Sequence, residues 1–132
     1  MSAKLIIAAG VLGASGVLLG ALGAHALKDV LDADSRKGEA FATAVDYHLI
    51  HALAVLTLGF FARQGAGKTS RRCTSAAWAM VSGVAIFSGS LYAWSLGGPS
   101  WLVHVTPFGG LTLIVGWLLV ARAGLGLTRG RE

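Results

Sequence analysis

The chain has 132 residues, of which 55% are hydrophobic and 13% charged, and eleven Lys and Arg against six Asp and Glu give it a formal net charge of +5. In soluble proteins roughly a quarter of the residues are charged, about twice the fraction found here. The composition therefore predicts one small membrane domain, residues 1–132. The basic excess requires no nucleic acid, because Lys and Arg gather in the cytoplasmic loops of membrane proteins. The single cysteine, Cys73, excludes an intrachain disulfide.

Four apolar segments predict an all-α, integral membrane four-helix up-down bundle. They cover residues 5–27, 39–62, 73–96 and 101–121, and a helix needs about 20 apolar residues to cross the hydrocarbon core. The second segment is the weakest, because Asp46, His48 and His51 interrupt it. Barrel strands would alternate over about ten residues, a pattern that this sequence lacks, and the short loops favour antiparallel neighbours.

Glycines recur three and four residues apart along the first segment. Small residues on one helical face allow another helix to approach closely, which drives helix packing in lipid. We therefore predict a packing face at Gly13, Gly16, Gly20 and Gly23, and we favour a partner helix in the same chain over one in a second chain.

The first loop and the distribution of charge predict local structure and orientation. A short helical turn is expected around residues 27–31, with Asp34 or Ser35 as the N-cap of the next helix. Eight of the eleven basic residues lie at the N-terminus, in the second loop and in the tail. The positive-inside rule then places both termini in the cytoplasm, in the bacterial inner (plasma) membrane.

The second segment carries the strongest candidate for a functional residue, His51. At 1.5 Å per residue it lies near the midplane of the membrane, and Tyr47 and His48 share its helical face. Ionisable groups at that depth are costly and usually face the bundle interior. The imidazole either bonds between helices, ligates a metal or haem together with His25, or contacts a proton or solute. We expect His25, His48 and His104 to be interfacial and solvated.

The third and fourth segments add hydroxyl groups and a helix-weakening motif. Ser88, Tyr92 and Ser95 share one helical face and could bond to the histidines. Pro107, followed by Gly109 and Gly110, predicts either a kink packed on a neighbour or a broken helix that exposes carbonyl groups. Aromatic residues near segment ends usually anchor a helix at the headgroups, as we expect for Trp94, Trp101 and Trp117.

Five short blocks resemble the DUF423 family of small bacterial inner-membrane proteins, which is related to the transmembrane protein 256 group. The blocks are Gly20-Ala-Leu-Gly-Ala-His25, Tyr47-xxx-His51-Ala-Leu-Ala54, Phe87-Ser-Gly-Ser-Leu-Tyr92, Val105-Thr-Pro-Phe-Gly-Gly110 and Gly116-Trp117. The resemblance implies a four-helix membrane protein without implying an activity. The candidate polar or ligand-binding residues that match it are His25, Tyr47, His51, Ser88, Tyr92 and Pro107.

Three functions are compatible with these residues. No catalytic constellation can be assembled, so we expect no enzyme, and the leading hypothesis is a scaffold or accessory subunit that packs with itself or with a larger membrane complex. The alternatives are a transporter or binding protein for an ion, proton or small solute around His51, and a histidine-ligated metal or haem site at His25 and His51. The cofactor is unknown, and the lipid bilayer is the one partner that the composition requires.

Overall fold

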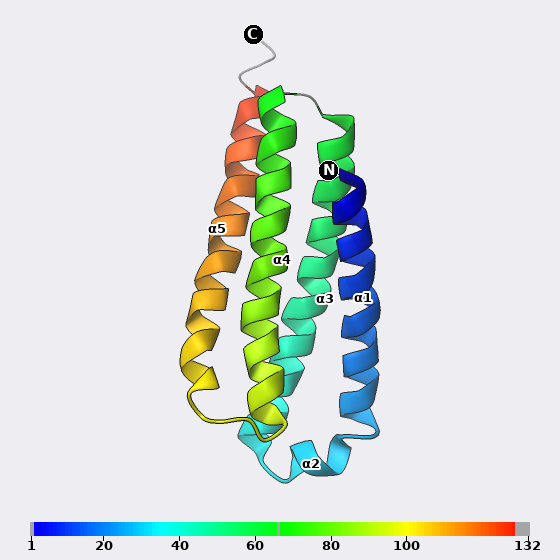
Figure 1. The fold of residues 1–132 in the computed structure, drawn as a ribbon, viewed down its shortest axis with the longest axis vertical. Helices are drawn as coiled ribbons and strands as arrows, with labels where there is room; N and C mark the ends of the chain where they lie inside the picture. The colour runs from blue at the N-terminus through cyan, green and yellow to red at the C-terminus, as the bar shows by residue number, and fades with distance from the viewer. Residues whose placement is uncertain (1, 66, 129–132) are drawn as a thin grey trace.

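Four long helices and one short helix form the structure, a computed structural model that describes residues 2–65 and 67–128. The long helices are α1 (Ser2–Ala24), α3 (Ser35–Gln64), α4 (Gly67–Ser95) and α5 (Leu102–Thr128), and α2 (Lys28–Asp32) connects α1 to α3 (Figure 1). Neighbouring long helices run antiparallel, and all four are long and apolar enough to cross a membrane. The predicted all-α four-helix membrane fold is confirmed, while the membrane side that each end faces remains a prediction.

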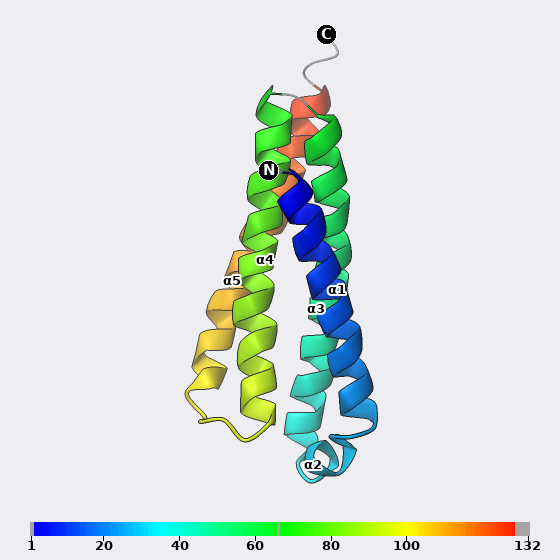
Figure 2. The same ribbon diagram turned by 45° about the vertical axis from the view of Figure 1, so that its right-hand side comes forward.

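The long helices stand in the order α1, α3, α4, α5. Figure 1 shows α3 and α4 in the middle, with α1 and α5 on the outside, and in Figure 2 α1 lies in front. α1 packs chiefly on α3, and α5 packs on α4. The start of α1, the end of α5 and the connection between α3 and α4 lie toward the same end of the molecule (Figure 1).

Helix boundaries differ from those predicted from hydropathy. α3 begins at Ser35 rather than at residue 39, α4 begins at Gly67 rather than at 73, and α5 continues to Thr128 rather than ending at 121. α1, by contrast, ends at Ala24 instead of at residue 27. Hydropathy locates the apolar part of a span, whereas backbone hydrogen bonds extend a helix through flanking polar residues.

The predicted first loop is confirmed in both of its details. α2 covers Lys28–Asp32, and the Asp34 carboxylate caps α3 by accepting a hydrogen bond from the Arg36 amide at 3.1 Å. Within α2, the exposed Lys28 amine donates to Asp32 one turn later, and this hydrogen bond raises the pKa of Lys28. The chain therefore turns from α1 to α3 through a short polar helix.

Two buried clusters form the apolar core. The larger joins all four long helices, and the smaller joins α2, α3 and α4. The larger cluster contains Leu5, Ala9, Val55, Leu58, Ala62, Cys73, Ala76, Ala77, Met80, Val84, Leu113 and Ala123; the smaller contains Leu31, Phe41, Ala44, Leu91 and Tyr92.

The glycines of α1 divide between two environments. Gly16, Gly20 and Gly23 lie against side chains of α3, so this part of the predicted packing face meets a helix of the same chain. A Cβ added at Gly13 would meet nothing within 4 Å, and the same is true of Gly10. The first turns of the glycine pattern therefore border open space beside α3 instead of packing against it.

Glycines also set the spacing between α4 and α5. Gly83 lies against Leu113, Gly116 lies against Met80, and a Cβ at Gly109 would overlap the backbone of Phe87. α5 is continuous through Pro107, so the predicted break that exposes carbonyls is wrong for this segment. The small residues after Pro107 serve close helix packing.

Replacing Gly109 by Ala is expected to lower the free energy of unfolding by about 1–3 kcal/mol, because the added methyl group overlaps helix backbone that cannot rotate away. Unfolding in mixed micelles, followed by circular dichroism, measures the change. Gly89→Ala on α4 is the matched control, since its Cβ meets nothing within 4 Å and Ala favours a helix. An equal loss in both variants would contradict the close approach at Gly109.

Candidate functional site

His51 forms one hydrogen bond within α3 and one that connects α3 to α5. Its side chain is buried, its Nδ1 lies 2.7 Å from the Tyr47 carbonyl oxygen, and the indole N–H of Trp117 donates to its Nε2 at 3.1 Å. A carbonyl only accepts and an indole N–H only donates, so the proton of the neutral ring is on Nδ1. Both ring nitrogens are therefore paired within the chain.

His48 forms a second connection, which joins α1, α3 and α4. Its Nε2 lies 3.3 Å from Ser15 Oγ, and its Nδ1 lies 3.3 Å from the Tyr92 hydroxyl. The Ser15 hydroxyl donates to the Val11 carbonyl at 2.8 Å, which leaves a lone pair to accept from the Nε2–H of His48. Nδ1 then accepts from Tyr92, so the two histidines carry their protons on opposite nitrogens.

The environments of His48 and Trp117 correct two predictions. His48 is 6% exposed rather than interfacial and solvated. α3 begins four residues earlier than expected, so His48 lies about 20 Å along the helix from Ser35. The prediction that Trp117 anchors its helix at the headgroups is wrong. α5 continues well beyond Trp117, and the indole N–H of Trp117 donates across the bundle to His51.

Serine and threonine hydroxyls attach α4 to its neighbours. Ser88 Oγ donates to the Ala44 carbonyl and Ser95 Oγ to the Lys37 carbonyl, each at 2.9 Å, while Ser90 Oγ pairs with Thr106 Oγ1 at 2.8 Å. Of the serines and tyrosine that we predicted as histidine partners, Tyr92 forms a hydrogen bond with an imidazole, whereas Ser88 and Ser95 donate to carbonyls. Across residues 2–65 and 67–128, no buried side-chain nitrogen or oxygen lacks a hydrogen-bond partner.

Of the remaining candidate residues, Tyr47 lies beside His51, with ring centroids 5.8 Å apart, whereas His25 and Pro107 do not contribute to the histidine hydrogen bonds. His25 and Pro107 are exposed, and Tyr47 is half-exposed, with its ring stacked on Phe87 at a centroid distance of 4.5 Å. Gly16 packs beside His48, so His25 and His51 lie about 18 Å apart along the bundle. A single ion cannot contact both imidazoles at that separation.

The arrangement is unsuited to binding a metal ion. A histidine ligates through a lone pair, and the lone pairs on His51 Nε2 and His48 Nδ1 accept from Trp117 and Tyr92. No group of three His, Cys, Asp or Glu side chains that could hold an ion occurs in the part of the chain that the structure describes. The chemistry supported here is hydrogen bonding between neutral groups.

Sequence reasoning missed Ser15 and the indole of Trp117 as histidine partners. Residues 15 and 117 are far apart in the chain from 48 and 51, so helical periodicity gives no sign of either contact. The burial of His48 could have been predicted, because His48 lies on the same helical face as His51. A predicted helix start at residue 39, four residues too late, instead places His48 near the membrane surface.

Comparison with known proteins gives a consistent family match. Residues 19–110 match the family described as "Protein of unknown function (DUF423)". The UPF0382 membrane protein YwdK of Bacillus subtilis is 36% identical over 81% of this chain and 84% of its own length. The UPF0382 inner membrane protein YgdD of Escherichia coli is 31% identical over 95% of this chain and 92% of its own length. No solved structure matches the chain.

Replacing Trp117 by Phe removes the indole N–H that donates to His51 Nε2 while keeping an aromatic ring. We expect a loss of about 0.6 kcal/mol in the free energy of unfolding, the average measured for hydrogen bonds between membrane helices, and at most about 1.7 kcal/mol. Trp101→Phe is the control, because Trp101 is 60% exposed. If both variants unfold alike in a denaturing-detergent titration, the indole does not stabilise the bundle.

Replacing Tyr92 by Phe removes the hydroxyl that donates to His48, and we expect a similar loss of about 0.6 kcal/mol and at most about 1.7 kcal/mol. Tyr47→Phe removes a hydroxyl from a half-exposed tyrosine whose ring stacking is retained, so its stability should stay within about 0.5 kcal/mol of wild type. Combining Tyr92→Phe with Ser15→Ala tests whether the two contacts to His48 are coupled. Strict additivity would show that they do not act through one ring.

Proposed function

This chain belongs to the DUF423 family and is a multi-pass protein of the bacterial inner membrane, and from that premise we propose that it is a non-enzymatic scaffold or accessory subunit. The observation that carries the proposal is the pairing of the buried imidazoles inside the chain. All four ring nitrogens of His48 and His51 have protein partners, so the groups best suited to chemistry stabilise helix contacts.

The outer face of α1 supports a role in helix association. Gly10 and Gly13 line an apolar cavity of about 450 Å³ against α3, together with Val17 and Leu53. Val11 and Leu18 are also exposed on α1. Small residues beside an apolar groove let a further helix approach closely, and van der Waals packing drives such association in lipid. A second copy of the chain or a helix of a larger complex has the shape to fill this groove.

Cysteine crosslinking in intact membranes tests the scaffold proposal. In a Cys73→Ala background, Gly10→Cys places a thiol at the α1 groove, and Leu118→Cys places one on the exposed side of α5. Oxidation is expected to produce a discrete crosslinked species from Gly10→Cys and none from Leu118→Cys. Strictly monomeric protein from both variants, also after gentle detergent extraction, would count against a scaffold.

A transporter or binding protein for an ion, proton or small solute is the second candidate. The observation in its favour is that two imidazoles and a tyrosine hydroxyl lie together inside membrane-spanning helices, where polar groups are costly. Vesicles containing the purified protein and a pH-sensitive dye test proton movement directly. Flux that His51→Gln and His48→Gln abolish, and Tyr47→Phe preserves, would replace the scaffold by a transporter.

A further inference from the structure

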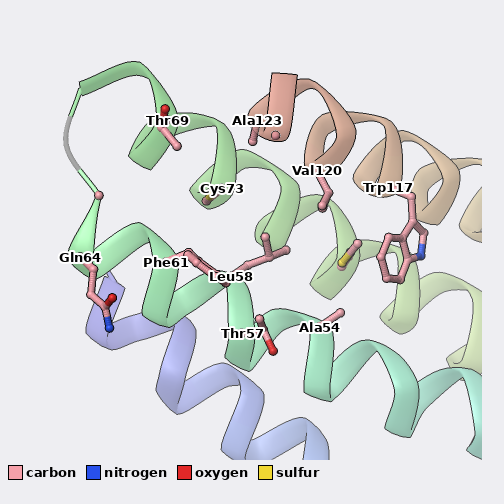
Figure 3. A pocket seen from close by; sticks show the side chains of 13 residues that line it. Ala54, Thr57, Leu58, Phe61, Gln64, Thr69, Cys73, Trp117, Val120 and Ala123 are labelled. Atoms are coloured by element: carbon pink, nitrogen blue, oxygen red, sulfur yellow. The ribbon is translucent and has the colours of Figure 1, made fainter. Parts of the chain in front are cut away.

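A second groove lies at the end of the bundle that carries the α3–α4 connection. α3 and α5 stand on either side of α4 there and leave a cavity of about 540 Å³, shown in Figure 3. Cys73 and Met80 of α4 form its base. The walls and rim come from Ala54, Thr57, Leu58, Phe61, Gln64, Gly65, Thr69, Trp117, Val120, Ala123 and Gly124.

The groove has the depth of one membrane leaflet. Along α3 it extends from Ala54 to Gly65, which is about 16 Å at 1.5 Å per residue. Half of a hydrocarbon core of roughly 30 Å is about 15 Å. Trp117, whose indole N–H bonds to His51, closes the inner end. An acyl chain fits that length, whereas a membrane-spanning helix would need a groove through both leaflets.

Cations lie at the open end of this groove. Lys68, Arg72 and Arg122 line an adjoining cavity of about 480 Å³, and Thr69 borders both cavities. The Arg72 guanidinium is held in place, because its Nη1 donates to the Arg122 carbonyl oxygen at 3.2 Å. A guanidinium has five N–H donors, so others remain for an anion.

No acidic side chain of the described residues neutralises these cations. Among residues 2–65 and 67–128, every Asp and Glu lies between positions 29 and 46, and the only ion pair joins Lys28 to Asp32 in α2. α2 lies at the opposite end of the bundle (Figures 1 and 2). The open end of the groove is therefore a positively charged site at the level of the membrane surface.

We propose that this groove binds one anionic glycerophospholipid from the leaflet at that end of the bundle. An acyl chain lies between α3 and α5 up to Trp117, and the phosphate contacts Arg72, Arg122 and Lys68. Basic pockets between membrane helices on the cytoplasmic side bind lipid headgroups through the same chemistry. Charge complementarity selects an anionic lipid over a zwitterionic one, because no described carboxylate is present to pair with a choline or ethanolamine.

Two double variants separate this site from general surface charge. Arg72→Gln with Arg122→Gln removes two cations of the site, and Arg63→Gln with Arg71→Gln removes two from the same end that line neither cavity. Native mass spectrometry of protein released from mixed micelles measures retained phosphatidylglycerol against phosphatidylcholine. We expect the first pair to lose the preference for phosphatidylglycerol roughly fivefold or more, and the second pair to keep it.

A variant that retains every charge tests the apolar part of the site. A Cβ at Gly124 meets nothing within 4 Å, so Gly124→Leu should fold normally while occupying the groove. We expect it to lose the retained lipid, and Gly10→Leu, in the α1 groove, to keep it. Quenching of tryptophan fluorescence by brominated phosphatidylglycerol should decrease in parallel, because Trp117 lines the groove.

Three outcomes would overturn the proposal. Equal retention of the two lipids by wild type would show that the site has no selectivity. If both double variants lost the preference for phosphatidylglycerol equally, the preference would come from general surface charge. Disulfide-linked dimers formed by Gly124→Cys in a Cys73→Ala background would show that a second copy fills the groove. The scaffold proposal concerns the α1 groove, so either proposal can fail without the other.

Discussion

The structure depends on the requirement that a polar group in lipid find its hydrogen-bond partner inside the chain. Backbone groups satisfy this requirement by forming helices. Hydroxyl groups satisfy it by donating to carbonyls of a neighbouring helix, as Ser88 and Ser95 do toward α3. His48 and His51 meet it with all of their ring nitrogens. Polar groups that would be costly alone thereby specify which helices are neighbours and how they are aligned.

Close packing explains the rest of the arrangement. Glycines on α1 admit side chains of α3, and Gly83, Gly109 and Gly116 let α4 and α5 approach each other. α4 lies between α3 and α5, and the Trp117–His51 bond is a direct side-chain connection between those two helices. Beyond that bond an apolar groove lies between the two helices, over buried residues of the larger core. The same contact that completes the polar core thus marks the inner end of the groove.

Charge gives the two ends of the bundle different chemistry. The loop around α2 mixes acidic and basic residues and contains the Lys28–Asp32 pair, whereas the described part of the other end carries only cations. Positive residues without acidic neighbours suit a surface rich in anionic lipid, such as the negatively charged cytoplasmic leaflet. Orientation in the membrane and lipid selection would then follow from the same residues, Lys68, Arg72 and Arg122.

The sequence by itself determined the membrane fold, because apolar segments of about 20 residues have few alternatives to a spanning helix. It also predicted the α2 turn and an N-cap at Asp34 or Ser35, because both depend on neighbouring residues, and the structure places the cap at Asp34. Only the tertiary structure decided that His48 is buried, that Ser15 and Trp117 are histidine partners, and that His25 lies far from His51. Those facts depend on which faces of distant helices meet and at what height, and helical periodicity carries no information about either.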